Sequence, residues 1–158
     1  MPLIARPFTA SEYATWMEHS IAAYAADKVA AGTWLAADAP QRAAASLAAE
    51  LPAGPATAGH LLRMIVTDDV EAQTIGWFWV GPAINAAPDL AWLYDIEIVS
   101  AHRGQGHGRA VMALAEIAAR ELGYARLGLH VFAHNSAARS LYEKCGYTLT
   151  DLSYAKQL

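Results

Sequence analysis

Residues 103–109 read Arg103-Gly104-Gln105-Gly106-His107-Gly108-Arg109, between an apolar segment that ends at Val99 and an alanine-rich helical pattern. Glycine at every second position lets the backbone adopt positive φ and approach a bound group closely. The helix that follows presents first-turn N–H groups without intrahelical partners and the positive end of its dipole. The stretch therefore predicts a phosphate site with two arginines at its rim, the alternative being a plain glycine-rich turn with solvated arginines.

Two other phosphate-binding loops do not match this stretch. A Walker loop requires Gly-Lys followed by Ser or Thr, whereas the sequence here is Gly108-Arg109-Ala110. A dinucleotide fingerprint that starts at Gly104 requires a third glycine where Arg109 stands, and an acidic residue about twenty positions later that is also missing. Both loops are therefore excluded.

The pattern Arg103-x-x-Gly106-x-Gly108 resembles the Gln/Arg-x-x-Gly-x-Gly/Ala signature with which the GNAT N-acetyltransferase superfamily binds the pyrophosphate of acetyl-coenzyme A. A second pattern is similar to the superfamily's second motif: Asn135-x-x-Ala138-x-x-Leu141-Tyr142-x-x-x-Gly146-Tyr147. The resemblance extends from about Trp92 to Tyr147, and earlier residues match only in the order of their elements. It implies an α/β (α+β) fold in which about four helices flank a mixed, mostly antiparallel central sheet, with the cofactor in a cleft where the fourth and fifth strands splay.

Length and composition indicate a single domain that spans residues 1–158. The longest apolar runs fall far below the roughly 20 residues that cross a bilayer, and the N-terminus lacks a basic region followed by an apolar one. We therefore expect a soluble, cytoplasmic protein that does not bind membranes. The single cysteine, Cys145, excludes an internal disulfide.

The charge distribution bears on the partners of the chain. The formal net charge of −4 gives no reason to expect nucleic acid as a partner. Residues 1–99 contain eleven acidic and four basic side chains, whereas residues 100–158 contain four acidic and seven basic ones. The half without the phosphate turn is thus acidic, which favours a cationic small-molecule or peptide amine as the second substrate. No feature indicates the oligomeric state.

Periodicity and capping residues predict the order of the elements. Thr9 and Glu12 form a capping-box pattern before the first helix, and Asp38 is the expected N-cap of the second. The expected helices are 11–29, 39–51, 108–121 and 136–144. The expected strands are 3–8, 60–67, 74–80, 90–99, 126–132 and two short strands within 147–158, the second and third forming an antiparallel hairpin.

Two acidic residues are candidates for the catalytic base. Acetyl transfer requires an amine that has lost its proton, and an alkylammonium with a pKa near 10.4 is neutral in only about one molecule in 2,500 at pH 7. In the segment 94–98 acidic and apolar residues alternate, so Asp95 and Glu97 share one face of the expected strand. Either could take the proton directly or through water, and Glu97 is slightly favoured because it lies nearer the phosphate turn; the alternative is an ordinary solvent face.

The resemblance assigns further roles. Tyr142 corresponds to the residue that donates a proton to the departing thiolate, or else packs the last helix on the sheet. Asn135 corresponds to the residue that contacts the pantetheine arm or a water, and it also suits an N-cap. Ile98 and Val99 would pair with the pantetheine amides. The implied cofactor-binding residues are Ile98, Val99, Arg103, Gly104, Gln105, Gly106, His107, Gly108, Arg109, Asn135 and Tyr142, with His107 standing where an aliphatic or aromatic residue is commoner.

Other side chains admit more than one interpretation. The six histidines lack the spacing of metal ligands, so no metal is expected. His130 could contact the acceptor or belong to the core. The aromatic residues of the first half are mostly core, although one or two could bind a cation over their rings. The sequence therefore predicts acetyl transfer from acetyl-coenzyme A to a primary amine within a ternary complex, the alternative being a coenzyme A-binding module without turnover.

Overall fold

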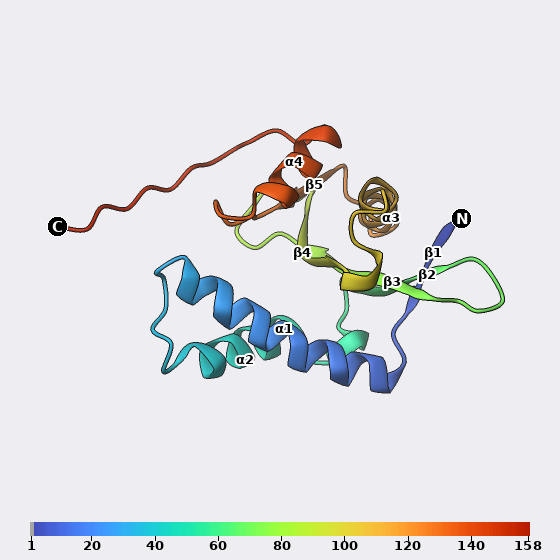
Figure 1. Cartoon of the computed structure of the whole chain (residues 1–158), viewed down its shortest axis with the longest axis horizontal. Coiled ribbons are helices and arrows are strands. Elements are labelled where there is room, and N and C mark those ends of the chain that lie inside the picture. The colour runs from blue at the N-terminus through green and yellow to red at the C-terminus, as the bar shows by residue number, and fades with distance from the viewer. Residues whose placement is uncertain (1) are drawn as a thin grey trace.

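The computed structural model describes residues 2–158, and within them five strands form one sheet flanked by four α-helices (Figure 1). The strands are β1 (Leu3–Pro7), β2 (Leu61–Thr67), β3 (Thr74–Pro82), β4 (Leu90–Ile98) and β5 (Arg126–Leu129). The helices are α1 (Ala10–Ala30), α2 (Ala39–Glu50), α3 (Gly108–Glu121) and α4 (Ser136–Lys144). The predicted α+β class, the four helices and the hairpin of β2 and β3 are confirmed.

The sheet is mixed and opens next to β4. Its order is β1-β2-β3-β4-β5; the pairs β1–β2, β2–β3 and β3–β4 are antiparallel, and β5 is parallel to β4. β5 pairs only with Leu90 to Leu93, while β3 follows β4 as far as Ile98. The second half of β4 therefore has a free edge on the β5 side, where the splayed strands were expected, and it is this half that carries Asp95 and Glu97.

The helices cover the two faces of the sheet and bury separate parts of the core. In Figure 1, α1 and α2 lie together on one side of the sheet, and α3 and α4 lie on the other. The largest cluster of buried side chains joins the strands to α3, through residues such as Val111, Met112 and Ala115. A second cluster joins the sheet to α1 and α2 through Trp16 and Leu47. Burial of these faces is the main source of their stability.

The start of α1 follows the sequence prediction closely. The Thr9 hydroxyl accepts a hydrogen bond from the Glu12 N–H, and the Glu12 carboxylate accepts one from the Thr9 N–H, which completes the capping box. Glu12 also forms a bidentate pair with Arg6 of β1, at 2.7 and 2.8 Å. Mainly because of the hydrogen bonds from Arg6, the pKa of Glu12 is lowered to about 2. Cap and ion pair together fix α1 to the first strand.

Asp38 is the N-cap residue of α2, as expected, but its side chain accepts no capping hydrogen bond; one carboxylate oxygen lies 3.8 Å from Nη1 of Arg42 instead. Two strand expectations were wrong. The expected strand 126–132 ends at Leu129, because β5 pairs with β4 only from Leu90 to Leu93. Residues 147–158 form no strand: after Gly146 the chain leaves α4 and runs away from the sheet (Figure 1), so no neighbouring strand accepts its backbone hydrogen bonds. Within residues 2–158, no helix combines the length and apolarity that crossing a membrane requires.

Candidate functional site

The glycine turn leaves its outer side open. The chain passes from β4 through a short 3₁₀ turn, Ser100–His102, and α3 then begins at Gly108. Gly104 and Gly106 have φ of +73° and +85°, the left-handed conformation that side chains disfavour. A methyl group placed on either one would meet no atom within 4 Å. Backbone conformation therefore requires these glycines, and the space above the turn is free for a ligand.

A row of backbone donors faces this space. His107 is the N-cap of α3 but makes no side-chain cap. Among the described residues, none of the backbone N–H groups of residues 104–110 donates a hydrogen bond to the protein. Unpaired donors at the positive end of a helix, in a turn without side chains, fit the oxygens of a pyrophosphate. Gly108 has a different role: a methyl group there would meet Leu141 of α4 at 2.9 Å, so its absence lets α3 and α4 pack closely.

The polar side chains of the turn have different neighbours. Arg103 points back along β4: its Nε donates to the Ile98 carbonyl at 2.8 Å and its Nη2 to Oε1 of Glu97 at 2.7 Å. Arg109 is exposed and forms no ion pair with any residue that the structure describes. The Gln105 amide donates to the carbonyl of residue 101 at 2.9 Å. The His107 ring is half-buried. Because Arg103 is engaged by Glu97 and Ile98, Arg109 is the arginine whose charge is free to face a ligand at the turn.

Backbone groups at the end of β4 are partly engaged. The Val99 N–H donates to the Ile75 carbonyl at 2.9 Å, and the Ile98 carbonyl accepts from Arg103. A pantetheine arm that pairs with Ile98 and Val99 would use the groups that remain, so this pairing stays a prediction.

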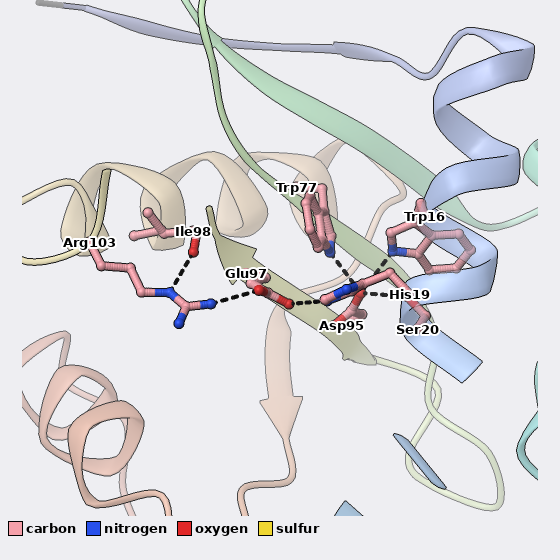
Figure 2. A network of polar contacts seen from close by, with 8 residues as sticks. All are labelled: Trp16, His19, Ser20, Trp77, Asp95, Glu97, Ile98 and Arg103. Atoms are coloured by element: carbon pink, nitrogen blue, oxygen red, sulfur yellow. Dashed lines mark hydrogen bonds and ion pairs between the residues drawn. The ribbon is translucent and has the colours of Figure 1, made fainter. Parts of the chain in front are cut away.

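Asp95 lies in β4 and is held by indole donors from two elements. Its Oδ2 accepts hydrogen bonds from Nε1 of Trp16 at 2.8 Å and Nε1 of Trp77 at 2.9 Å, and a longer one of 3.4 Å from the Ser20 hydroxyl (Figure 2). Its Oδ1 accepts none from the described residues. Burial raises the pKa of Asp95 because it disfavours the charged form; the two indoles oppose that rise, and the charge of Glu97 adds to it.

Glu97 joins the phosphate turn to α1. While Oε1 accepts from Arg103, Oε2 lies 2.7 Å from Nε2 of His19, and Figure 2 shows the chain of contacts from Arg103 through Glu97 to His19. The His19 ring also packs edge-on against Trp77, with ring centroids 5.3 Å apart. Both carboxylate oxygens of Glu97 are therefore engaged, unlike those of Asp95.

His19 and Ser20 were not expected in the site, and Trp16 was expected only as one of the aromatic residues that are mostly core but could bind a cation. The available signal was their spacing, because positions 16, 19 and 20 share one face of a helix. That face meets the acidic face of β4, so the helix supplies three polar groups to one pair of carboxylates.

These residues line one cavity of about 510 Å³ between α1 and α2 on one side and β4, β5 and α4 on the other. Asp95, Glu97, Asn135 and Tyr142 all line it, so the candidates for the base, the acid and the pantetheine contact lie together. Asn135 also caps α4, since its side-chain oxygen accepts from the Ala138 N–H at 3.1 Å. Burial, and then the charge of Asp95, raises the pKa of the Tyr142 hydroxyl.

Part of the cavity wall is aromatic and acidic. Asp27 and Glu50 line it, and among residues 2–158 Glu50 has no ion-pair partner. Trp79 and Tyr94 stack with ring centroids 4.4 Å apart. Burial, then the charge of Glu50, raises the pKa of Tyr94 to about 12. Four carboxylates thus face one lysine, which makes the cavity suited to a cation.

The basic groups of the cavity are partly committed to other contacts. The Lys28 ammonium lies 5.5 Å from the ring centroids of both Tyr24 and Trp34. His130 lines the cavity just beyond β5, where burial and then the charge of Lys28 lower its pKa, so its ring is neutral at pH 7. In the described part of the chain, no three His, Cys, Asp or Glu side chains are grouped as a metal site would require.

Comparisons of the sequence and of the structure with known proteins both find acetyltransferases. The family model described as the acetyltransferase (GNAT) family matches residues 6–147. The uncharacterized N-acetyltransferase YycN of Bacillus subtilis (strain 168) is 34% identical over 158 residues, which is 100% of both chains. The crystal structure of YycN superposes with a TM-score of 0.89 and 33% identity over 99% of this chain and 98% of that one. The spermidine N-acetyltransferase of Vibrio cholerae, solved with CoA and spermine, shares the fold, with a TM-score of 0.62 and 19% identity over 91% of this chain and 79% of that one.

Proposed function

Because this chain belongs to the acetyltransferase (GNAT) family, we propose that it transfers an acetyl group from acetyl-coenzyme A directly to a primary amine, with both substrates bound at once. The observation that carries the proposal is the junction of two features. The open turn with its unpaired N–H groups is joined to the acidic cavity through Arg103 and Glu97, and through the contact of Gly108 with the helix that bears Tyr142. A phosphate bound at the turn and a proton acceptor in the cavity would thus lie within one continuous structure.

The residues that would hold coenzyme A are those of the turn and of α4. The N–H groups of residues 104–110 would bind the pyrophosphate, and Arg109 would add its positive charge. Ile98, Val99 and Asn135 would contact the pantetheine arm. The thioester of the bound substrate supplies the activated acetyl group, and what remains for the protein is to orient the amine and to move protons.

Asp95 is the better supported proton acceptor. Its Oδ1 is free of hydrogen bonds from the described residues, and its raised pKa makes proton capture easier than at an ordinary aspartate. Glu97, in contrast, has both oxygens engaged by Arg103 and His19. We therefore assign Asp95 as the base and Glu97 as the alternative base. In the main assignment, Glu97 positions the end of β4 and His19.

Tyr142 is proposed as the proton donor to the departing thiolate. Its raised pKa keeps the hydroxyl protonated at neutral pH, so a proton is available as charge develops on sulfur. Because a thiol, with a reference pKa near 8.5, is a stronger acid than this phenol, the tyrosinate then recovers a proton from the thiol or from solvent. The family resemblance assigns the same role to this residue.

The acceptor we propose is a small cationic amine. The aromatic and acidic wall favours a second positive group beyond the reacting one, because ring faces and carboxylates both attract cations. The spermidine N-acetyltransferase that shares the fold was solved with spermine, a polyamine, which makes polyamines the first compounds to test.

The experiment is thiol release from acetyl-coenzyme A with polyamines, aminoglycosides, amino acids and short peptides as acceptors. We expect turnover with at least one polycationic amine, and about a hundredfold loss in Asp95→Asn and at least a tenfold loss in Tyr142→Phe. Arg139→Gln, an exposed position on α4, is the matched control and should retain the wild-type rate. Tight coenzyme A binding without turnover on any amine would instead support a binding module, and no binding would refute the phosphate site.

A further inference from the structure

An irregularity in β4 turns Tyr94 into the cavity that holds Asp95. In the pairing of β3 with β4, Trp79 lies opposite Asp95, whereas the residue after Trp79 lies opposite Leu93. Tyr94 is therefore an extra residue without a partner, and a bulge of this kind re-aims a side chain. Tyr94 and Asp95 accordingly both line the cavity although they are successive residues. The proposed base thus has an aromatic ring as its direct neighbour.

Tyr94 is the accessible member of the stacked aromatic pair. Trp79 is only 4% exposed, whereas Tyr94 keeps part of its surface accessible. Because the two rings are stacked, Trp79 supports the Tyr94 ring from behind. The Tyr94 hydroxyl donates to the Pro82 carbonyl at 2.6 Å, which fixes the far end of the ring. A ligand in the cavity therefore meets the ring of Tyr94 rather than that of Trp79.

Trp79 is held in turn by His60, which does not line the cavity. The Trp79 indole Nε1 donates to Nδ1 of His60 at 2.9 Å. The His60 ring centroid lies 5.8 Å from the ring centroids of both Trp79 and Tyr94. Gly81 makes room for this arrangement, since a methyl group on Gly81 would collide with the His60 ring. His60, Trp79 and Tyr94 thus form one packed cluster of three rings.

The charges around this cluster suit a cation. An indole N–H only donates, so Nδ1 of His60 is the acceptor and the ring proton stands on Nε2. Burial lowers the pKa of His60, which keeps the ring neutral at pH 7, and a neutral ring does not repel a nearby cation. Glu50 lines the cavity close to Tyr94: after burial, its charge is the next cause of the raised pKa of the Tyr94 hydroxyl.

We propose that Tyr94 and Glu50 bind the distal ammonium of a diamine or polyamine acceptor. His60 is a positioning residue for this site, because it fixes Tyr94 through Trp79. The proposal rests on the proposed function, since it takes the reacting amine of the acceptor to lie at Asp95. An aromatic face and a carboxylate attract an ammonium more strongly than a methyl group. The site therefore distinguishes acceptors by their second charge.

The test compares putrescine with butylamine, which has the same carbon chain but a single amine. Glu50→Gln should raise the KM for putrescine about tenfold relative to the KM for butylamine, because a carboxylate charge is lost beside the distal ammonium. Tyr94→Leu should change this ratio in the same direction. Glu18→Gln is the matched control, at an exposed position of α1 that does not line the cavity, and should keep the wild-type ratio. An unchanged ratio in Glu50→Gln would overturn the proposal.

The positioning role of His60 has its own pair of variants. His60→Phe keeps a ring in place but removes the acceptor of the Trp79 indole, so the same KM ratio should rise about fivefold while kcat changes little. His60→Asn should restore the ratio, because its side-chain oxygen occupies the δ1 position at which histidine has its acceptor nitrogen. A merely structural role predicts that His60→Phe weakens both amines alike, and that result would overturn the assignment of His60.

Calorimetric titration of the protein with each amine separates this test from that of the proposed function. If no amine is acetylated, the proposed function fails. Tighter binding of putrescine than of butylamine, lost in Glu50→Gln and retained in Glu18→Gln, would still support the cation site. Equal binding of the two amines, or no binding of putrescine, overturns it. Melting temperatures establish that each variant is folded.

Discussion

Replacement of Gly106 by alanine separates the ligand-binding role of the glycine turn from its role in folding. Gly106 has φ of +85°, and a methyl group there meets no protein atom within 4 Å. The substitution therefore introduces backbone strain of about 1–2 kcal/mol but no steric clash with the protein. For a chain of this length we expect the melting temperature to fall by a few degrees.

The same substitution should also weaken the binding of coenzyme A, by a mechanism that is separate from the backbone strain. The added methyl group stands in the open space into which the unpaired N–H groups point, so at least one hydrogen bond to phosphate is lost. A hydrogen bond to a charged group contributes about 1.5–3 kcal/mol, which corresponds to a dissociation constant that is roughly 10 to 150 times larger. Titration calorimetry with coenzyme A measures this change directly.

Gly123→Ala is the matched control, since Gly123 has φ of +88° and equally empty surroundings at the opposite end of α3. It should lose similar stability and retain its affinity for coenzyme A. If Gly106→Ala binds coenzyme A as tightly as Gly123→Ala does, the assignment of the turn as the pyrophosphate site is refuted.

Two further predictions follow from the pKa shifts. The proposed base, Asp95, must be deprotonated, so kcat/KM should fall as the pH is lowered, with a midpoint above the ordinary aspartate pKa of 3.8. Trp16→Phe should raise that midpoint by about one pH unit, because a lost hydrogen bond to a charged group is worth about 1.5 kcal/mol. Trp79→Phe should leave the midpoint unchanged, because the Trp79 indole donates to His60 instead. Glu12 has a pKa lowered from 4.5 to about 2, so its pair with Arg6 stabilises the fold above pH 4.5 and that stability is lost as pH falls toward 2. Thermal melts between pH 6 and 2 should therefore show a smaller acid-induced drop in Arg6→Gln than in the wild type, and equal drops would contradict the account.

Much of the fold could be predicted from the sequence because local signals and packing agree. The capping box at Thr9 and the periodicity of the expected helix 108–121 both indicate the boundaries that the structure has, to within a residue or two. Asp38 is the N-cap residue of α2 without a side-chain hydrogen bond, because the residue type permits such a bond but does not enforce it, and its side chain lies near Arg42 instead. The strands expected in 147–158 failed because strand formation requires a neighbour, which sequence alone does not supply.

The site was predictable in its acidic pair and less so in what surrounds it. Alternation along β4 placed Asp95 and Glu97 on one face, and both do line the cavity. Their different environments depend on α1, which is distant in sequence: its indole and hydroxyl hold Asp95, while its histidine engages Glu97. Nearness to the turn favoured Glu97 as the base, but that same nearness brings Arg103 onto its carboxylate.

The measurement that tests the central claim most directly is the initial rate of thiol release as both acetyl-coenzyme A and the active amine are varied. Direct transfer in a ternary complex predicts lines that intersect in the double-reciprocal plot, with amine-dependent turnover that Asp95→Asn reduces about a hundredfold. Parallel lines would indicate an acetylated enzyme intermediate, and thiol release that is independent of any amine would contradict the account.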